Sequence, residues 1–258
     1  MHSAHLFLAI LLPALATACG TPDPIPGDVG ETGKGELVGS QVPDSTGLVA
    51  LREEMVRRQI EARGVGDTAV LRAMREVPRH RFVPEAPPPE AYADYPLSIG
   101  YGQTISQPYI VAFMAEAADI SPGDRVLEVG TGSGYGAAVL GKLASEVYTI
   151  EIVPELAQRA ASILGRLGFE NVVVRTGNGW LGWPENAPYD AVVVTAAPEE
   201  VPPNLVHQLA MGGRLVVPVG DLLQSLRVLR KTPQGMVEEG SLPVRFVPMV
   251  KARPDTGG

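Results

Sequence analysis

Cysteine and histidine are scarce in this sequence of 258 residues, which has one Cys and four His. A single cysteine excludes an intramolecular disulfide framework and a Cys-based zinc site, and four scattered histidines leave little for a metal cluster. Basic residues are outnumbered, 21 against 29 acidic ones, so the formal net charge is −8 and the isoelectric point is near 5.1. This excess of acidic residues argues against a broad basic surface that would bind nucleic acid. We therefore expect no metal and no nucleic-acid partner.

The sequence also has no hydrophobic run long enough to cross a bilayer. The apolar stretch near the N terminus covers Leu6 to Leu12 and is followed by small residues up to Cys19. It predicts a signal-like leader at residues 1–19 with a small-residue cleavage site. The sequence ATACG (16–20) resembles a bacterial lipoprotein box, in which the cysteine is lipidated after cleavage. The alternative is a mistaken start codon, in which case this segment is no part of the working protein.

Glycine and proline, with 29 and 24 residues, are too few for a collagen-like or wholly low-complexity chain. They are concentrated between residues 20 and 47, where no periodic apolar positions occur. That composition predicts a flexible tether. The rest of the chain is long enough to bury a full hydrophobic core. We expect one folded domain at 48–250 and a disordered tail at 251–258.

Short valine-rich segments bounded by Gly, Pro or Asp dominate the second half of the sequence, with helical stretches between them. Five are strand-like, at 125–130, 147–151, 172–177, 190–197 and 214–220. Near-continuous apolar strands that alternate with helices are typical of a parallel sheet covered on both faces. We predict a doubly wound, mostly parallel α/β domain of the Rossmann-like type. One or two further strands are expected in the tail, at 225–231 and 243–250.

Helices are predicted ahead of this sheet. Residues 48–63 combine good helix formers with one broad apolar half. Asp67 can cap a second helix. An irregular, proline-rich loop is expected next, and it leads to a helix that starts after Ser106 or Gln107 and continues to about Ala118.

The sequence EVGTGSGYG (128–136) follows the first strand and opens a helix, which is the place for a nucleotide-binding turn. Glu151 ends the second strand, about twenty residues later, where a carboxylate can accept hydrogen bonds from ribose hydroxyls. A dinucleotide frame fits from Gly132, but the frame E-x-G-x-G-x-G from Glu128 is closer to the loop of S-adenosylmethionine-dependent methyltransferases. Glu128 would attract a methionyl ammonium and sulfonium and would repel a pyrophosphate. A glycine-rich turn that binds nothing is the structural alternative.

Four segments carry a more specific resemblance. They are VPRHRFVP (77–84), PLSIGYGQTISQPY (96–109), LEVGTGSGY (127–135) and YDAVVVTAAP (189–198). In this order they closely resemble the protein-L-isoaspartate O-methyltransferase family, and the GQTIS stretch is highly specific to it. The resemblance implies methyl transfer from S-adenosyl-L-methionine to the free carboxyl of L-isoaspartyl, or D-aspartyl, residues in damaged proteins and peptides. The ester then cyclises to a succinimide, whose hydrolysis restores some normal aspartate.

The resemblance also implies roles for individual residues. Thr104 and Ser106 match the family's threonine and serine beside the methyl-transfer centre, and the Ser106 hydroxyl would help to hold the acceptor carboxylate. A helix N-cap is the other role considered for Ser106. Cofactor contacts are implied for Glu128, Gly130, Thr131, Gly132, Ser133, Gly134 and Glu151. Asn178 stands where the family has an aspartate for adenine, and loss of its charge would weaken cofactor binding by about 1 kcal/mol.

The acceptor chemistry needs no strong base, because an α-carboxyl with a reference pKa of about 3.5 is already ionised at neutral pH. Alignment and desolvation can then supply the catalysis. His80, which lies between two arginines, could contact the peptide, but we expect it at the surface.

Two other functions stay open at this point. One is a degenerate relative that binds cofactor or altered peptides without turnover, and the other is an NAD-dependent dehydrogenase. The resemblance implies a monomer. Because S-adenosylmethionine is made in the cytosol, we expect a cytoplasmic enzyme, and the alternative is an exported lipoprotein that reaches a membrane only through Cys19.

Overall fold

A computed structural model of the chain describes residues 46–251. The predicted leader (1–19), the predicted tether up to residue 45 and the predicted tail from residue 252 lie outside the described residues. Helix α1 (Thr46–Met55) begins two residues before the predicted start of the folded domain. Within residues 46–251, no helix has both the length and the apolar character that a membrane crossing needs.

The first two helices match the sequence pattern. α1 continues through a π-helical turn and a short 3-10 turn and ends at Gly64, whose φ of 97° is one that glycine adopts readily. α2 (Thr68–Glu76) begins after Asp67, whose carboxylate accepts hydrogen bonds from two backbone N–H groups of the first turn. Both predicted helices and the predicted cap are confirmed.

The segment predicted as an irregular loop contains regular structure. It holds the short helix α3 (Pro88–Ala91) and an antiparallel hairpin of β1 (Leu97–Gly100) and β2 (Gln103–Ile105). The turn between the two strands runs through residues 100–102, all with positive φ. Strands of only four and three residues, next to two glycines in the turn, are too short to show the alternation of apolar and polar residues by which a strand is predicted. The predicted irregular loop is therefore wrong at this point.

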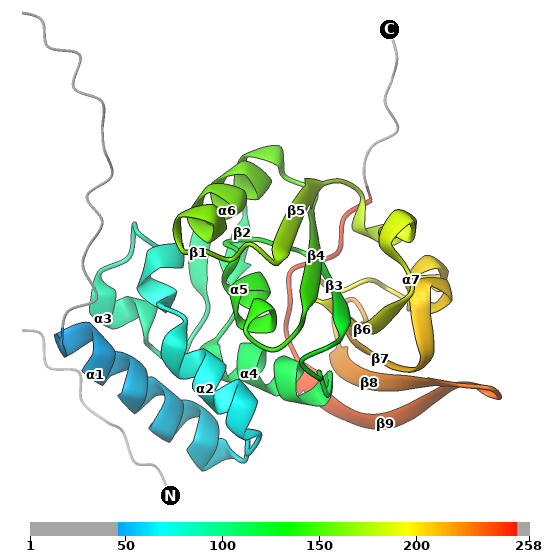
Figure 1. Cartoon of the computed structure of the whole chain (residues 1–258), viewed down its shortest axis with the longest axis horizontal. Helices are drawn as coiled ribbons and strands as arrows, with labels where there is room; N and C mark the ends of the chain where they lie inside the picture. The colour runs from blue at the N-terminus through cyan, green and yellow to red at the C-terminus, as the bar shows by residue number, and fades with distance from the viewer. Residues whose placement is uncertain (1–45, 252–258) are drawn as a thin grey trace, which may run out of the picture. The chain divides into compact units, whose positions relative to one another are not determined.

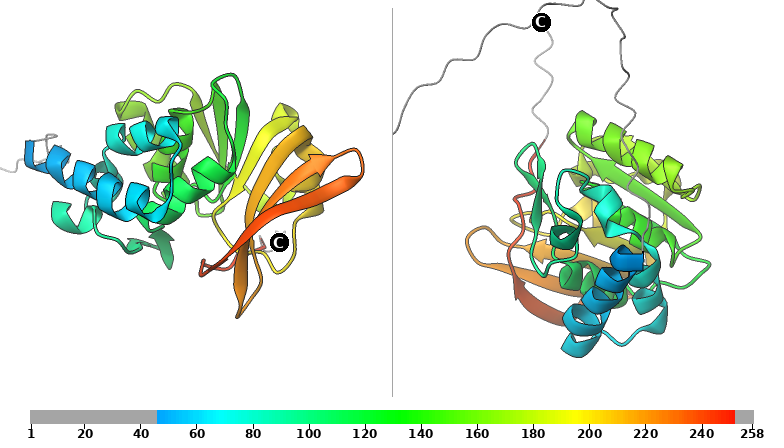
Figure 2. Two further views of the ribbon diagram at one scale, coloured as in Figure 1. Left: turned by 90° about the horizontal axis from the view of Figure 1, so that it is seen from below. Right: turned by 90° about the vertical axis from the view of Figure 1, so that its left-hand side faces the viewer.

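A seven-stranded sheet lies at the centre of the domain, in the order β5-β4-β3-β6-β7-β8-β9 (Figure 1). The strands are β3 (Arg125–Val129), β4 (Glu146–Glu151), β5 (Val172–Thr176), β6 (Tyr189–Val194), β7 (Leu209–Val219), β8 (Gln224–Thr232) and β9 (Gly235–Val244). β3 to β7 pair in parallel, and β8 and β9 add a long antiparallel extension (Figure 2). The predicted mostly parallel sheet with a C-terminal strand extension is confirmed.

The end of the chain differs from its prediction. β8 covers the expected strand at 225–231, but β9 ends at Val244, where the second expected strand only begins. Beyond it, Pro248 forms an isolated bridge with Ala197. β9 is mostly exposed and its apolar residues do not alternate regularly with polar ones, so apolar patterning does not reveal it. The mostly apolar segment 243–250 includes two prolines, which cannot donate to a ladder.

Both faces of the sheet are covered, as the apolar strands require. Val126 and Val193 pack on one face in a cluster with α1, α2, α4 (Pro108–Ala117), α5 (Tyr135–Gly141) and α6 (Pro154–Arg166). Leu127 and Val192 pack on the other, with α7 (Pro203–Gln208). Figure 1 shows α5 and α6 on one side of the sheet and α7 on the other. The doubly wound architecture is confirmed.

The carboxyl ends of β3, β4 and β6 meet at one edge of this sheet. β3 lies between β4 and β6, and the glycine-rich loop follows it directly. Ligands of doubly wound sheets bind at this edge, beside the strand where the direction of the crossovers reverses. The topology therefore places the predicted cofactor loop where such folds bind ligands.

Candidate functional site

The glycine loop is held against the neighbouring strand by its own backbone. The N–H of Gly130 donates to the carbonyl of Ile150 at 2.8 Å. Gly130, Gly132 and Gly134 have φ values of 100°, 53° and 89°, which side chains other than glycine adopt rarely. Gly134 is the cap residue of α5, so the loop delivers the chain directly into a helix N-terminus. Gly134 is buried, whereas Gly130 and Gly132 line the cleft with no side chain of their own in the way.

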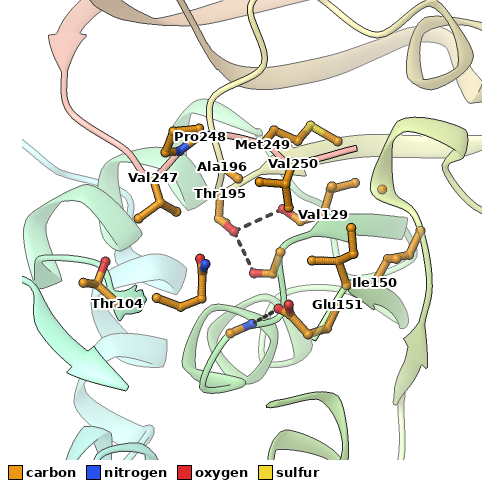
Figure 3. Close-up of a pocket in the computed structure, with 15 residues that line it drawn as sticks. Thr104, Val129, Ile150, Glu151, Thr195, Ala196, Val247, Pro248, Met249 and Val250 are labelled. Atoms are coloured by element: carbon orange, nitrogen blue, oxygen red, sulfur yellow. Dashed lines mark hydrogen bonds between the residues drawn. The ribbon is translucent and has the colours of Figure 1, made fainter. Parts of the chain in front are cut away.

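Thr195, which follows β6, packs closely against the loop. Its hydroxyl donates to the carbonyl of Gly130 at 2.7 Å and contacts the carbonyl of Val129 at 3.1 Å (Figure 3). A Cβ atom added at Gly130 would lie 2.3 Å from the Thr195 Oγ1 atom. This close approach leaves room for glycine alone at residue 130.

Glu151 ends β4 and is 5% exposed. One of its carboxylate oxygens accepts from the N–H of Gly132 at 2.7 Å, and the other accepts from the N–H of Val153 at 3.0 Å. A carboxylate has about four acceptor positions, so two backbone bonds leave capacity for a ligand hydroxyl. These bonds fix the orientation of the carboxylate before any ligand arrives.

These groups line a cleft that is open to solvent. Its walls are formed by Gln103, Thr104, Val129, Gly130, Gly132, Ile150, Glu151, Ile152, Gly179, Thr195, Ala196 and residues 247–250. Figure 3 shows Thr104 on one side of the cleft and the segment 247–250 across it from Glu151. The cleft suits a nucleoside with a free diol and a polar extension. It offers glycine backbone, the pre-oriented carboxylate of Glu151, and apolar walls from Ile150, Ile152 and Met249. The residues present therefore fit S-adenosylmethionine.

Glu128 lies behind the loop and does not line the cleft. It is 1% exposed, accepts a hydrogen bond of 2.6 Å from the Thr149 hydroxyl, and faces Gly136, where a Cβ would lie 2.4 Å from its oxygen. Burial raises the pKa of the Glu128 carboxyl to about 8; the Thr149 hydrogen bond opposes the rise and the charge of Glu151 adds to it. Thr131 and Ser133 are buried as well, and the Thr131 hydroxyl meets the Thr149 hydroxyl at 2.6 Å.

Asn178 stands at the turn after β5, next to a cleft residue. Its side-chain oxygen accepts from the N–H of Trp180 at 3.0 Å, which fixes the amide at the start of a 3-10 turn. The adjoining Gly179 lines the cleft, and a Cβ there would lie 2.3 Å from a methyl group of Val129. An adenine contact by Asn178 stays a prediction.

Of the two predicted acceptor residues, Thr104 lines the cleft and Ser106 is not one of the residues that line it. Thr104 is exposed on β2, and the half-buried Ser106 follows the last residue of that strand, the buried Ile105. Helix α4 begins at Pro108 with Gln107 as its cap residue, so the N-cap role considered for Ser106 is wrong. The carbonyl of Ser106 instead accepts a hydrogen bond of 2.8 Å from Arg79.

His80 also departs from expectation. It is 5% exposed, and its Nδ1 atom lies 2.7 Å from the hydroxyl of Tyr92. The expectation of a surface histidine is wrong, because the short 3-10 turn at 79–82 packs inward against α3 and α6.

Sequence reasoning singled out the glycine loop, Glu151 and Thr104 but did not single out Thr195, Ile152 or the residues 249–250 of the cleft wall. The signal for Thr195 is its place directly after the fourth expected strand, because parallel strands bring their carboxyl ends together. For the segment 247–250 only the family resemblance, which covers Val247 and Pro248, points to a binding site. Its residue pattern gives no signal, since the segment reaches the cleft by one bridge, between Ala197 and Pro248. Within residues 46–251, no group of three or more His, Cys, Asp or Glu side chains is placed to hold a metal ion.

Comparison with known proteins gives one consistent result. The family model described as protein-L-isoaspartate(D-aspartate) O-methyltransferase (PCMT) matches residues 50–254. A protein-L-isoaspartate O-methyltransferase of Gloeobacter violaceus is 58% identical over 202 residues, which are 78% of this chain and 98% of that protein. One from a Picosynechococcus species is 57% identical over 201 residues, 78% of this chain and 90% of its own.

Two solved structures are similar along most of the domain. One protein-L-isoaspartate O-methyltransferase has a TM-score of 0.71 and 33% identity, and the match covers 76% of this chain and 65% of that one. The other is described as a beta-aspartate methyltransferase (PCMT) from Plasmodium falciparum in complex with S-adenosyl-L-homocysteine, with a TM-score of 0.68, 26% identity and coverage of 78% and 98%.

The buried carboxyl of Glu128 predicts a pH-dependent stability. Its folded pKa of about 8 lies above the ordinary value of 4.5, so the folded state holds the proton more tightly and loses this stabilisation as pH rises from about 4.5 through 8. Glu128→Gln keeps an acceptor for Thr149 without the charge. Urea unfolding of the ligand-free protein should give Glu128→Gln a higher free energy of unfolding at pH 8.5, by roughly 3–5 kcal/mol, and a difference of about 1 kcal/mol or less at pH 5.

The control for this variant is Glu170→Gln, which removes an exposed carboxylate after α6. It should follow the wild type at each pH. A Glu128→Gln profile parallel to the wild type between pH 5 and 8.5 would contradict the assignment.

Gly130→Ala should disrupt the loop, because the new Cβ meets Thr195 Oγ1 and the positive φ is strained. We expect a loss of about 1–3 kcal/mol in unfolding free energy and at least a tenfold rise in the dissociation constant for S-adenosyl-L-homocysteine, measured by calorimetry. Adding Thr195→Ala removes the overlap between the new Cβ and Thr195 Oγ1 but not the strain of the positive φ. The double variant should therefore recover only part of the lost unfolding free energy and affinity. Gly165→Ala, in α6 with nothing within 4 Å of the added Cβ, is the matched control and should not destabilise the protein.

Proposed function

Because the chain belongs to the protein-L-isoaspartate(D-aspartate) O-methyltransferase family, we propose that it methylates the free carboxyl of isoaspartyl residues in damaged proteins and peptides, and so begins their repair through a succinimide. The observation that carries this proposal is the shared cleft: Thr104 of the acceptor hairpin faces the same space as Gly130, Gly132 and Glu151 of the cofactor side. One cleft can therefore bring donor and acceptor together.

S-adenosylmethionine supplies an electrophilic methyl group on a sulfonium when it is bound. Glu151 would hold the ribose hydroxyls with the acceptor positions that its two backbone bonds leave free. The backbone of Gly130 and Gly132 would lie along the polar extension, and Ile150, Ile152 and Met249 would pack against the flat base. Asn178 would accept from the adenine amino group with the second lone pair of its oxygen, since the first is used by Trp180.

Glu128 would act on the cofactor through the loop rather than by contact. A cation in the cleft favours the ionised form of the Glu128 carboxyl. Because Glu128 is buried, water screens this attraction little. Binding near neutral pH should then release part of a proton from Glu128. Thr149 and Thr131 form the hydroxyl chain that links this carboxylate to the loop.

The acceptor carboxylate is ionised at neutral pH and needs no base to become a nucleophile. Thr104 and Ser106 would donate hydroxyl hydrogen bonds that align one of its oxygens along the line of transfer. The segment 247–250 lines the side of the cleft opposite Glu151 and would shield the reacting groups from part of the solvent (Figure 3). Positioning and desolvation therefore carry the catalysis.

The test is a methylation assay with methyl-labelled S-adenosylmethionine and an isoaspartyl peptide. We expect base-labile label on that peptide and none on its normal aspartyl counterpart. Ser106→Ala should lower kcat by roughly 10- to 100-fold, the effect of losing one hydrogen bond to a charged group. Ser162→Ala, on the exposed face of α6, is the control and should match the wild type. Retained S-adenosyl-L-homocysteine binding with no label from the wild type would identify a non-catalytic binding relative instead.

We also propose that the working enzyme is a cytoplasmic monomer that starts close to the folded domain. The supporting argument is supply, because the methyl donor is made in the cytosol. Export as a lipoprotein anchored at Cys19 is the alternative. Intact mass measurement of the native protein should give an N terminus well beyond Cys19, near the start of α1. A diacylated or triacylated N-terminal Cys19 would overturn the cytoplasmic assignment.

A further inference from the structure

Arg79 is a fully buried cation in the 3-10 turn at 79–82. Among the residues that the structure describes, no carboxylate lies within ion-pair distance of it. Burial lowers its pKa to about 10, so the guanidinium is still charged at neutral pH. A buried charge without an opposite partner is costly, and an apolar side chain of similar volume would avoid that cost. Its presence therefore suggests a role other than general stability.

The guanidinium joins two separate backbone segments. Its Nε donates to the carbonyl of Ala91 at 2.7 Å, and its Nη2 donates to the carbonyl of Ser106 at 2.8 Å. Ala91 is the last residue of α3, and Ser106 is the residue between β2 and the cap of α4. A planar guanidinium presents several donors in a fixed arrangement, so it can hold both carbonyls at once.

The same guanidinium lies over an aromatic ring on the cofactor side. Its Cζ atom is 4.9 Å from the centre of the Tyr135 ring, and Tyr135 is the first residue of α5, directly after Gly134 of the glycine loop. Tyr135 is fully buried and packs edge-on against Phe82, at 5.7 Å between ring centres. Arg79 thus contacts the start of the helix that follows the cofactor loop and the residue that carries the acceptor hydroxyl.

We propose that Arg79 is a positioning residue for methyl transfer, which fixes the backbone of Ser106 relative to the glycine loop. The inference rests on the proposed function. It assigns Arg79 no contact with substrate. Its action passes through the Ser106 carbonyl on one side and the Tyr135 ring on the other. Loss of either link would let the acceptor hydroxyl move relative to the methyl donor, and small misplacements of reacting groups are costly in rate.

The test compares Arg79→Met and Arg79→Lys with the wild type. Arg79→Met keeps the packing volume and removes both carbonyl bonds, whereas a lysine ammonium can reach one carbonyl but lacks the fork that holds two. In folded protein, kcat on a saturating isoaspartyl peptide should fall at least tenfold for Arg79→Met and less for Arg79→Lys. The dissociation constant for S-adenosyl-L-homocysteine should change less than twofold in both.

Met74→Ala separates positioning from stability. Met74 is fully buried and its sulfur lies 3.7 Å from the Tyr135 hydroxyl, but it does not touch the Ser106 carbonyl. The Met74→Ala variant should have a lower melting temperature than the wild type, and its kcat in folded protein should stay within twofold of the wild-type value. Arg166→Met, on the exposed end of α6, should change neither the melting temperature nor kcat. A Met74→Ala loss of kcat equal to that of Arg79→Met, or an Arg79→Met kcat within twofold of the wild type, would refute the proposal.

Hydrogen exchange gives a readout that does not depend on activity. Exchange of the backbone amides at 103–107 should be at least tenfold faster in Arg79→Lys, or in Arg79→Met if it folds, while amides of β3 and β4 are unchanged. Unchanged exchange at 103–107 would overturn the proposal even if the wild type shows no methyl transfer. Wild-type inactivity together with faster exchange would instead count against the proposed function alone.

Discussion

The contact between Gly130 and Thr195 is the constraint on which the site depends. Thr195 binds the carbonyls at the end of β3, and this draws the end of β6 and the glycine loop together with no space for a side chain at residue 130. The loop backbone is then bare, its N–H groups are committed to Ile150 and Glu151, and α5 begins directly after Gly134. The shape of the cleft follows from this one close approach.

Charge in the site is arranged in two layers. Glu151 lies at the surface of the cleft, where two backbone N–H groups hold its carboxylate in place. Glu128 lies one layer deeper, where burial favours the neutral form in the absence of a ligand. In the proposed function the two carboxylates would therefore have different tasks: Glu151 would offer acceptors to hydroxyls, and Glu128 would adjust its charge to a cation.

The sequence was informative where a local rule has a strong physical cause. The parallel strands, the caps at Asp67 and Gly64 and the cofactor loop follow from apolar runs, N-cap chemistry and glycine spacing. The sequence was uninformative where a structural feature depends on tertiary contacts. The β1–β2 hairpin is too short to show a period, β9 has no regular apolar alternation because it is mostly exposed, and the burial of His80 depends on its packing near α3. The cleft wall at 247–250 likewise depends on one bridge between distant segments.

The acceptor hydroxyls and the cofactor loop belong to different hydrogen-bonded units. Within residues 46–251, β1 and β2 form a sheet of their own and share no ladder with the seven-stranded sheet. The hairpin is attached to the rest by side chains, including Arg79 and Arg159, which donates to the carbonyl of Ile99 at 2.6 Å. The acceptor side of the proposed reaction would thus be carried by a short segment whose backbone pairing is independent of the large sheet, so substitutions in its exposed positions would leave the strand ladder of the donor half intact.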